Sequence, residues 1–227
     1  IAQCLVGSEM CIRDRPMKNS YRTIREDGQS EQEIKKSRFI CSLKRVTSEE
    51  EAKAFILALK KEHWKANHNC SAFVIGENNE IQRSSDDGEP SGTAGVPMLD
   101  VLKKNELINV VAVVTRYFGG TKLGAGGLIR AYASTVAAAL KEIGIVEGTL
   151  NQTLYLTIDY PQLGKLQNHL EHQNIHLASI DYTDKIRVTL MVPEISLSAV
   201  EADLTDLLQG QLEIAHGPVS YVERPIS

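Results

Sequence analysis

The sequence predicts an α+β protein of two domains, and two stretches of the chain predict it. Residues 109–143 have the pattern of a strand, a glycine-rich loop and a helix, in which a buried strand leads into a helix that covers its sheet. After Gly148, hydrophobic alternation and turn residues follow the order β-α-β-β-α-β, which is the order of a ferredoxin-like sheet. A chain of 227 residues is long enough to form two domains with separate cores.

The strand of the first stretch begins at Val110, where five consecutive apolar residues predict burial on both faces of a sheet. The helix that follows has apolar residues four apart, at Leu128, Tyr132, Val136 and Leu140. Tyr132 would either stack on an exposed base or belong to the core, and its place in this stripe favours the core. Gly144 is expected to end the helix, and Gly148 to mark the domain boundary.

The loop between this strand and helix contains five glycines, which are Gly119, Gly120, Gly124, Gly126 and Gly127. Backbone N–H groups in such a loop can approach an anion, and a helix N-terminus favours negative charge. Arg116, Lys122 and Arg130 would add positive charge. Glycine also permits positive φ and close packing without any ligand. The spacing alone favours packing, because the loop fits neither the nucleotide phosphate loop nor the dinucleotide fingerprint.

A second motif places three carboxylates in four residues, at Asp86, Asp87 and Glu89, around Gly88. Such a cluster would suit Mg²⁺, which prefers oxygen ligands. A turn built from Asp, Gly and Pro needs the same residues for its backbone geometry, and one acid could pair with Arg116. We favour the turn and the ion pair, since no further ligand is evident, and we expect no metal and no cofactor.

Other polar side chains also have two interpretations. Lys36 and Arg38 fall on one side of a strand expected over residues 33–40, either as a solvated basic face or as phosphate contacts. The set His63, His68 and Cys70 could form a metal site or a nucleophile pair, but structural packing is favoured. His169 and His172 are three apart on a helix and are expected to form a solvated pair.

The net charge of −4 is unevenly distributed. From Thr149 onward ten acidic side chains oppose four basic ones, so this part carries −6 and the remainder +2. Any RNA or phosphate contact is therefore expected in the first domain.

The sequence also suggests a location. No apolar run approaches the roughly 20 residues that span a bilayer. Residues 1–16 resemble a translated sequencing-adaptor artefact, which makes Met17 the expected start. The remaining Cys41 and Cys70 lack the pattern of a disulfide framework, so we expect a cytoplasmic protein without a membrane partner.

Several long motifs in one order resemble the YigZ/IMPACT family. They are DDGEPSGTAG at residues 86–95, RYFGG at 116–120, LGAGGL at 123–128 and KKSRFI at 35–40. The resemblance implies a first domain at 17–147 with the left-handed βαβ architecture of elongation factor G domain four. It implies a ferredoxin-like second domain at 148–227. The eukaryotic branch of the family is associated with regulation of translation.

These observations lead to one main functional hypothesis. We expect a non-catalytic, translation-associated protein that binds the ribosome, rRNA or tRNA, or a translation-regulatory protein. The first domain would bind through the five loop glycines and the basic residues Lys36, Arg38, Arg116, Lys122 and Arg130. One alternative is a binder of a phosphate-containing small ligand, or a metal-dependent enzyme, that uses the glycine and acidic loops. Another is a protein-interaction module formed by the acidic second domain.

Overall fold

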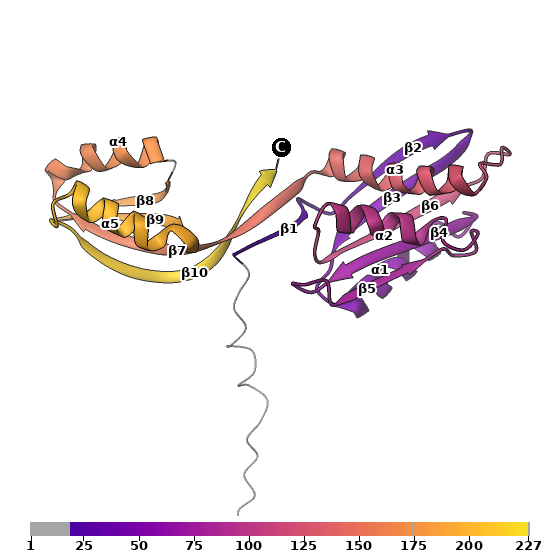
Figure 1. Cartoon of the computed structure of the whole chain (residues 1–227), viewed down its shortest axis with the longest axis horizontal. Coiled ribbons are helices and arrows are strands. Elements are labelled where there is room, and N and C mark those ends of the chain that lie inside the picture. The colour runs from indigo at the N-terminus through magenta and orange to yellow at the C-terminus, as the bar shows by residue number, and fades with distance from the viewer. Residues whose placement is uncertain (1–18, 174, 227) are drawn as a thin grey trace, which may run out of the picture. The chain divides into compact units, whose positions relative to one another are not determined.

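A computed structural model describes residues 19–173 and 175–226 and confirms the two-domain α+β fold (Figure 1). The first domain comprises residues 20–149 with 221–226, and the second comprises residues 150–220 with Asn19. Two strands, β7 (Ile145–Ile158) and β10 (Glu213–Ile226), contain residues of both domains. Gly148 lies inside β7. The expected artefact at residues 1–16 lies outside the described part of the chain.

An antiparallel sheet in the order β2-β3-β6-β4-β5 forms the centre of the first domain. Its strands are β2 (Gly28–Ile34), β3 (Ser37–Arg45), β4 (His68–Ile75), β5 (Ile81–Ser85) and β6 (Val110–Tyr117). A further strand, β1 (Ser20–Ile24), pairs with β7. The middle position of β6 puts its carboxyl end beside the ends of two neighbouring strands.

Three described helices cover this sheet, namely α1 (Glu49–Glu62), α2 (Gly95–Lys104) and α3 (Ala125–Ile143). Alternate residues of β6 face opposite cores. Val110, Ala112 and Val114 pack in the core that α2 and α3 share. Val111 and Val113 pack in the core that α1 covers. The predicted burial of this strand on both faces is thus confirmed.

The expectation of one continuous strand over residues 33–40 is wrong. Lys35 and Lys36 have φ angles of 46° and 66° and form a two-residue turn. Positive φ at both positions is the geometry that suits the twist of a tight hairpin. Ile34 therefore pairs with Ser37, and Lys36 lies in the turn while Arg38 lies on β3. The two basic residues do not share a strand face.

The second domain has the predicted ferredoxin-like topology. Its sheet has the order β10-β7-β9-β8, which is the fourth, first, third and second strand of the domain. The other elements are η1 (Tyr160–Gln162), α4 (Leu163–Gln173), β8 (His176–Tyr182), β9 (Ile186–Pro193), η2 (Glu194–Ser196) and α5 (Leu197–Leu207). Leu166 and Leu170 of α4 and Leu204 of α5 pack on the sheet.

The two histidines of α4 have different environments. His172 is exposed, whereas the Nε2 atom of His169 lies 2.6 Å from an Asp203 carboxylate oxygen of α5. His169 is therefore part of a contact between the helices rather than half of a solvated pair.

Candidate anion-binding site

The motif residues of the first domain meet at one end of its sheet. Arg116 near the end of β6 is paired with Phe39 of β3 and with His68 of β4. The loop 118–124 leads from this end of β6 into α3 (Figure 1). The register of the sheet thus brings residues from distant parts of the sequence to the start of α3.

Asp86 of the acidic loop is bound by the start of α2. Its carboxylate oxygens accept hydrogen bonds from the backbone N–H groups of Gly92, Ala94 and Gly95, at 2.8, 3.1 and 2.8 Å. Partial burial opposes ionisation, but these three N–H groups outweigh it and hold the pKa of Asp86 below its usual value. Asp86 therefore supplies the negative charge that the α2 N-terminus favours.

Both carboxylate oxygens of Asp87 also contact groups within the protein. One oxygen of its carboxylate lies 2.6 Å from Nζ of Lys60, and the other accepts the Asn69 N–H at 2.6 Å. The described residues contain no group of three His, Cys, Asp or Glu side chains that could hold a metal ion.

Glu89 forms the predicted ion pair with Arg116. An Nη1 atom of Arg116 lies 2.6 Å from Oε1 of Glu89, and the two side chains are 6% and 4% exposed. The Tyr132 hydroxyl donates to the same oxygen at 2.8 Å. Tyr132 is fully buried, as its apolar stripe predicts, and burial with the nearby Cys70 and Glu89 raises its pKa. Arg116 is thus an internal charge and not a mobile one.

The loop glycines have different structural roles. A side chain at Gly119 would collide with the backbone of Lys36, so this glycine permits close packing. Gly120 and Gly124 have positive φ angles of 86° and 71°. Neither close packing nor positive φ requires a glycine at position 126, because its φ is not positive and an added Cβ would meet no atom within 4 Å. An added Cβ at Gly127 would lie 3.2 Å from the Leu123 side chain.

The N-terminus of α3 lacks an acceptor within the described part of the chain. Its first turn contains no acidic residue, and Gly124 at the N-cap has no side chain that could cap it. The first hydrogen bond is donated by the N–H of Leu128 to the Gly124 carbonyl oxygen at 2.9 Å. Among the described residues, the N–H groups of Ala125, Gly126 and Gly127 therefore have no acceptor. We call these three N–H groups the α3 site.

A cavity of about 410 Å³ adjoins the α3 site. Apolar side chains form much of its wall, and they are Pro90, Phe118, Leu123, Ala125 and Leu128. His68, Glu89 and Arg116 contribute polar atoms. Arg116 is 5% exposed, and its Nε–H has no hydrogen-bond partner among the residues that the structure describes. A buried donor without a partner is costly, but this atom is covered by the protein, so a ligand in the cavity would accept its hydrogen bond only after a shift of the Arg116 side chain.

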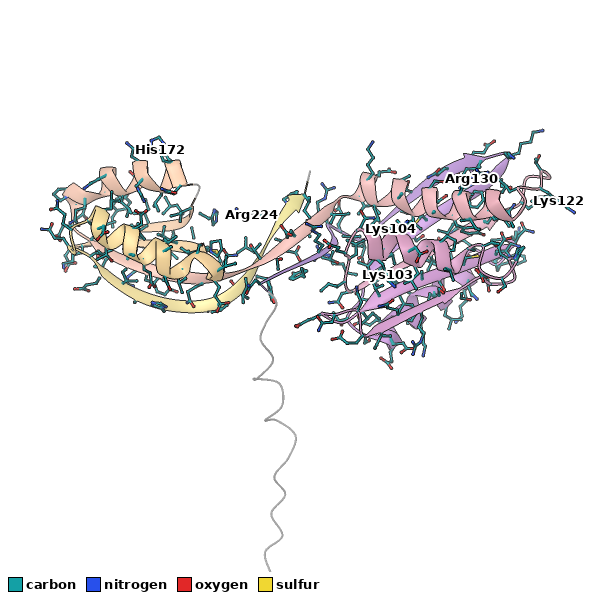
Figure 2. All side chains as sticks on the ribbon, in the orientation of Figure 1. Lys103, Lys104, Lys122, Arg130, His172 and Arg224 are labelled. Atoms are coloured by element: carbon teal, nitrogen blue, oxygen red, sulfur yellow. The ribbon has the colours of Figure 1, made fainter. Side chains whose placement is uncertain are left out.

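The other predicted cations differ in availability. Arg38 is held by Glu31, with Nε and Nη2 at 2.5 and 2.7 Å from its two carboxylate oxygens. Lys36, Lys122 and Arg130 are exposed and have no acidic partner in the described part of the chain. Figure 2 shows Lys122 on the loop before α3 and Arg130 on α3 itself.

The predicted set His63, His68 and Cys70 does not converge. Nδ1 of His63 lies 3.0 Å from the Tyr117 hydroxyl, whereas Nδ1 of His68 lies 2.9 Å from the Asp87 carbonyl oxygen. Burial raises the pKa of the Cys70 thiol to about 12, so it is a poor nucleophile near neutral pH. Structural packing, the favoured interpretation, accounts for these contacts.

Comparison with known proteins establishes the family. Residues 35–140 match the Impact N-terminal domain, and residues 156–211 match a domain of unknown function (DUF1949). The chain is 50% identical over 211 residues to IMPACT family member YvyE of Bacillus subtilis, covering 93% of this chain and 97% of that protein. The chain belongs to the IMPACT family.

Other IMPACT relatives agree with this assignment. The chain is 37% identical to IMPACT family member YigZ of Escherichia coli, over 81% of this chain and 91% of that protein. A match to the Protein IMPACT homolog of Saccharomyces cerevisiae is 40% identical but covers only 39% of this chain and 35% of that protein.

A solved structure supports the fold. A crystal structure described as that of a hypothetical protein aligns with 86% of this chain and 96% of its own, with a TM-score of 0.55 and 34% sequence identity. No helix in the described part of the chain is both long and apolar enough to span a membrane.

Sequence reasoning missed two residues of this site. The sequence indicates Phe118 only as part of the RYFGG motif and His68 only as a member of the set with His63 and Cys70, yet both line the cavity. The pairing of His68 with Arg116 across two strands brings His68 to the cavity. The sequence contains no local signal of this pairing, because the two residues are far apart along the chain.

Proposed function

We propose that the first domain of this IMPACT family chain binds ribosomal or transfer RNA, with a backbone phosphate at the α3 site. The observation that supports this most directly is the set of three N–H groups at a helix N-terminus without an acceptor among the described residues, beside a Gly126 that neither positive φ nor a close neighbour requires. Glycine inside a helix is less favourable than alanine by about 1 kcal/mol. A phosphate that needs close access to the backbone explains this residue.

The exposed cations near the same end of the sheet support RNA rather than an isolated anion. Lys122 precedes the α3 site, and Lys36 lies in the turn whose backbone contacts Gly119. Several phosphates along an RNA backbone would reach such dispersed charges, and the affinity would fall with salt as counterions are released. Residues before Thr149 carry a net charge of +2, whereas those from Thr149 onward carry −6. This difference also favours RNA binding by the first domain.

The geometry gives less support to a metal-dependent enzyme. Asp86 and Asp87 use their carboxylates on backbone N–H groups and on Lys60, and Glu89 uses its carboxylate on Arg116. A small phosphate-containing ligand at the α3 site would use the same contacts as RNA. Binding of a protein by the second domain stays a prediction.

The test compares Gly126→Ala with the unaltered full-length chain. A methyl group at this position would point toward the helix N-terminus and cover the N–H groups that bind phosphate. We expect Gly126→Ala to be as stable as the parent or more stable by up to about 1 kcal/mol, because its Cβ meets no neighbour. RNA affinity at low salt should nevertheless fall severalfold, measured by fluorescence anisotropy with tRNA and by cosedimentation with ribosomes.

The chain offers a matched control in Gly164→Ala. Gly164 is the second residue of α4, as Gly126 is of α3, and its added Cβ also meets nothing within 4 Å. This variant should gain similar stability without any change in RNA affinity. Equal RNA affinity of both variants and the parent, or no RNA binding at low salt, would refute the proposal.

A further inference from the structure

The cavity beside the α3 site is larger than a phosphate requires. Its volume of about 410 Å³ lies within the range typical of small-molecule pockets. We infer that it receives one unpaired nucleotide of RNA, with the phosphate at the α3 site and the base in the apolar part of the cavity. This inference rests on the proposed RNA binding and adds the form of RNA that is recognised.

Phe118 provides a surface on which a base can stack. The side chain is 45% exposed although it is aromatic and lines the cavity. Its main chain is held at this place, because its backbone N–H donates to Oδ1 of Asn67 at 2.8 Å. The guanidinium carbon of Arg116 lies 5.6 Å from the ring centroid. An aromatic ring that is open to solvent can stack a base of any sequence.

Arg116 and His68 line the cavity and are the polar groups nearest to the edge of a bound base. The Nε–H of Arg116 is a buried donor without a partner among the described residues, and a base would reach it after a small shift of this side chain. The acceptor is Nε2 of His68 in the neutral ring. Nδ1 of His68 contacts the Asp87 carbonyl oxygen, which can only accept a hydrogen bond, so Nδ1 carries the proton and Nε2 is left as the acceptor. Base edges display both donors and acceptors.

A paired base cannot enter this cavity, because its edge and both faces are occupied within a duplex. Extrusion of a base costs unstacking energy, which is least for a bulged or single-stranded nucleotide. The cavity should therefore favour RNA with an unpaired nucleotide over a duplex of equal length and charge. The α3 site and the exposed lysines should bind the phosphates of both forms.

The experiment measures binding of the full-length chain to two RNAs. One is a duplex with a single bulged 2-aminopurine nucleotide, and the other is the corresponding fully paired duplex. We expect the bulged RNA to bind about tenfold more tightly through stacking on Phe118, with a rise in 2-aminopurine fluorescence as the base leaves its stack in the RNA. Phe118→Ala and Phe118→Leu should abolish both the preference and the fluorescence change, while duplex affinity stays unchanged.

Ile129→Ala serves as the matched control, because Ile129 is an exposed apolar residue of α3 that does not line the cavity. It should retain the preference. Equal affinity for the two RNAs, unaffected by the Phe118 variants, would overturn this inference and leave the RNA proposal standing. Absence of binding to either RNA would overturn both. Free AMP binding as tightly as the bulged RNA, with the same loss in Phe118→Ala, would overturn RNA as the source of the nucleotide.

Discussion

The N-termini of α2 and α3 differ in how their backbone N–H groups are satisfied. At α2 the carboxylate of Asp86 accepts three hydrogen bonds from backbone N–H groups. At α3 neither an acidic residue nor a capping side chain is present, and three N–H groups have no acceptor among the described residues. Both helices follow motif loops of the IMPACT family, so sequence resemblance alone does not separate them.

This difference shows that two similar loops can have opposite roles. The acidic loop supplies an anion from within the chain and thereby fixes its own conformation. The glycine loop leaves the same kind of position open, which suits an anion from outside the chain. The start of α1 resembles α2, because Ser48 caps it and Glu49, Glu50 and Glu51 occupy its first turn.

The largest expected effect concerns the ion pair that joins the acidic loop to the cavity. Arg116→Met would leave the Glu89 carboxylate buried without its partner, at a cost of about 3–5 kcal/mol in the free energy of unfolding. Urea unfolding monitored by circular dichroism would measure it. The double variant Arg116→Met with Glu89→Gln should recover part of the loss. If Arg116→Met were as stable as the parent, the ion pair between Arg116 and Glu89 would not stabilise the acidic loop.

A smaller effect is expected at the α2 N-terminus. Asp86→Asn would remove the charge from three hydrogen bonds and should lower the free energy of unfolding by about 1–3 kcal/mol near neutral pH. The folded state lowers the pKa of Asp86 below its usual 3.8. Its contribution is therefore complete above about pH 4 and is lost as the pH falls through the folded-state pKa.

Unfolding at neutral and acidic pH would measure this dependence. The difference in stability between the parent and Asp86→Asn should shrink in acid. Asp100→Asn, which changes an exposed carboxylate of α2, is the control and should leave stability unchanged. A difference that stays constant across this pH range would contradict the role given to the Asp86 charge.

The smallest effect on stability is expected where an anion is added to α3. Ala125→Glu would place a carboxylate in the first turn, as at α1, and should raise stability by about 0.3–1 kcal/mol. RNA affinity should fall, because the new charge repels phosphate at the α3 site. Ala125→Gln, of similar size without the charge, should bind RNA more tightly than Ala125→Glu. Equal RNA affinity of Ala125→Glu and Ala125→Gln would show that phosphate does not bind at the α3 N-terminus.

Predictions based on local patterns succeeded widely in this chain. The apolar run of β6, the end of α3 at Gly144 and the order of strands and helices along the second domain follow from residues close together in sequence. The hairpin at Lys35 and Lys36 was missed because its turn contains none of the glycine or asparagine residues that usually indicate positive φ.

By itself, the sequence determined the two domains, their elements, the resemblance to the IMPACT family and the glycine loop before α3. Tertiary structure decided which charges stay available. Arg116 is 27 residues from Glu89 in sequence, and only the sheet register and the packing of α3 bring them together with Tyr132. Tertiary structure also decided that Asp86 serves α2 while nothing in the described chain serves α3. The physical reason is that hydrogen bonds and ion pairs depend on distances in space, which local sequence patterns do not specify.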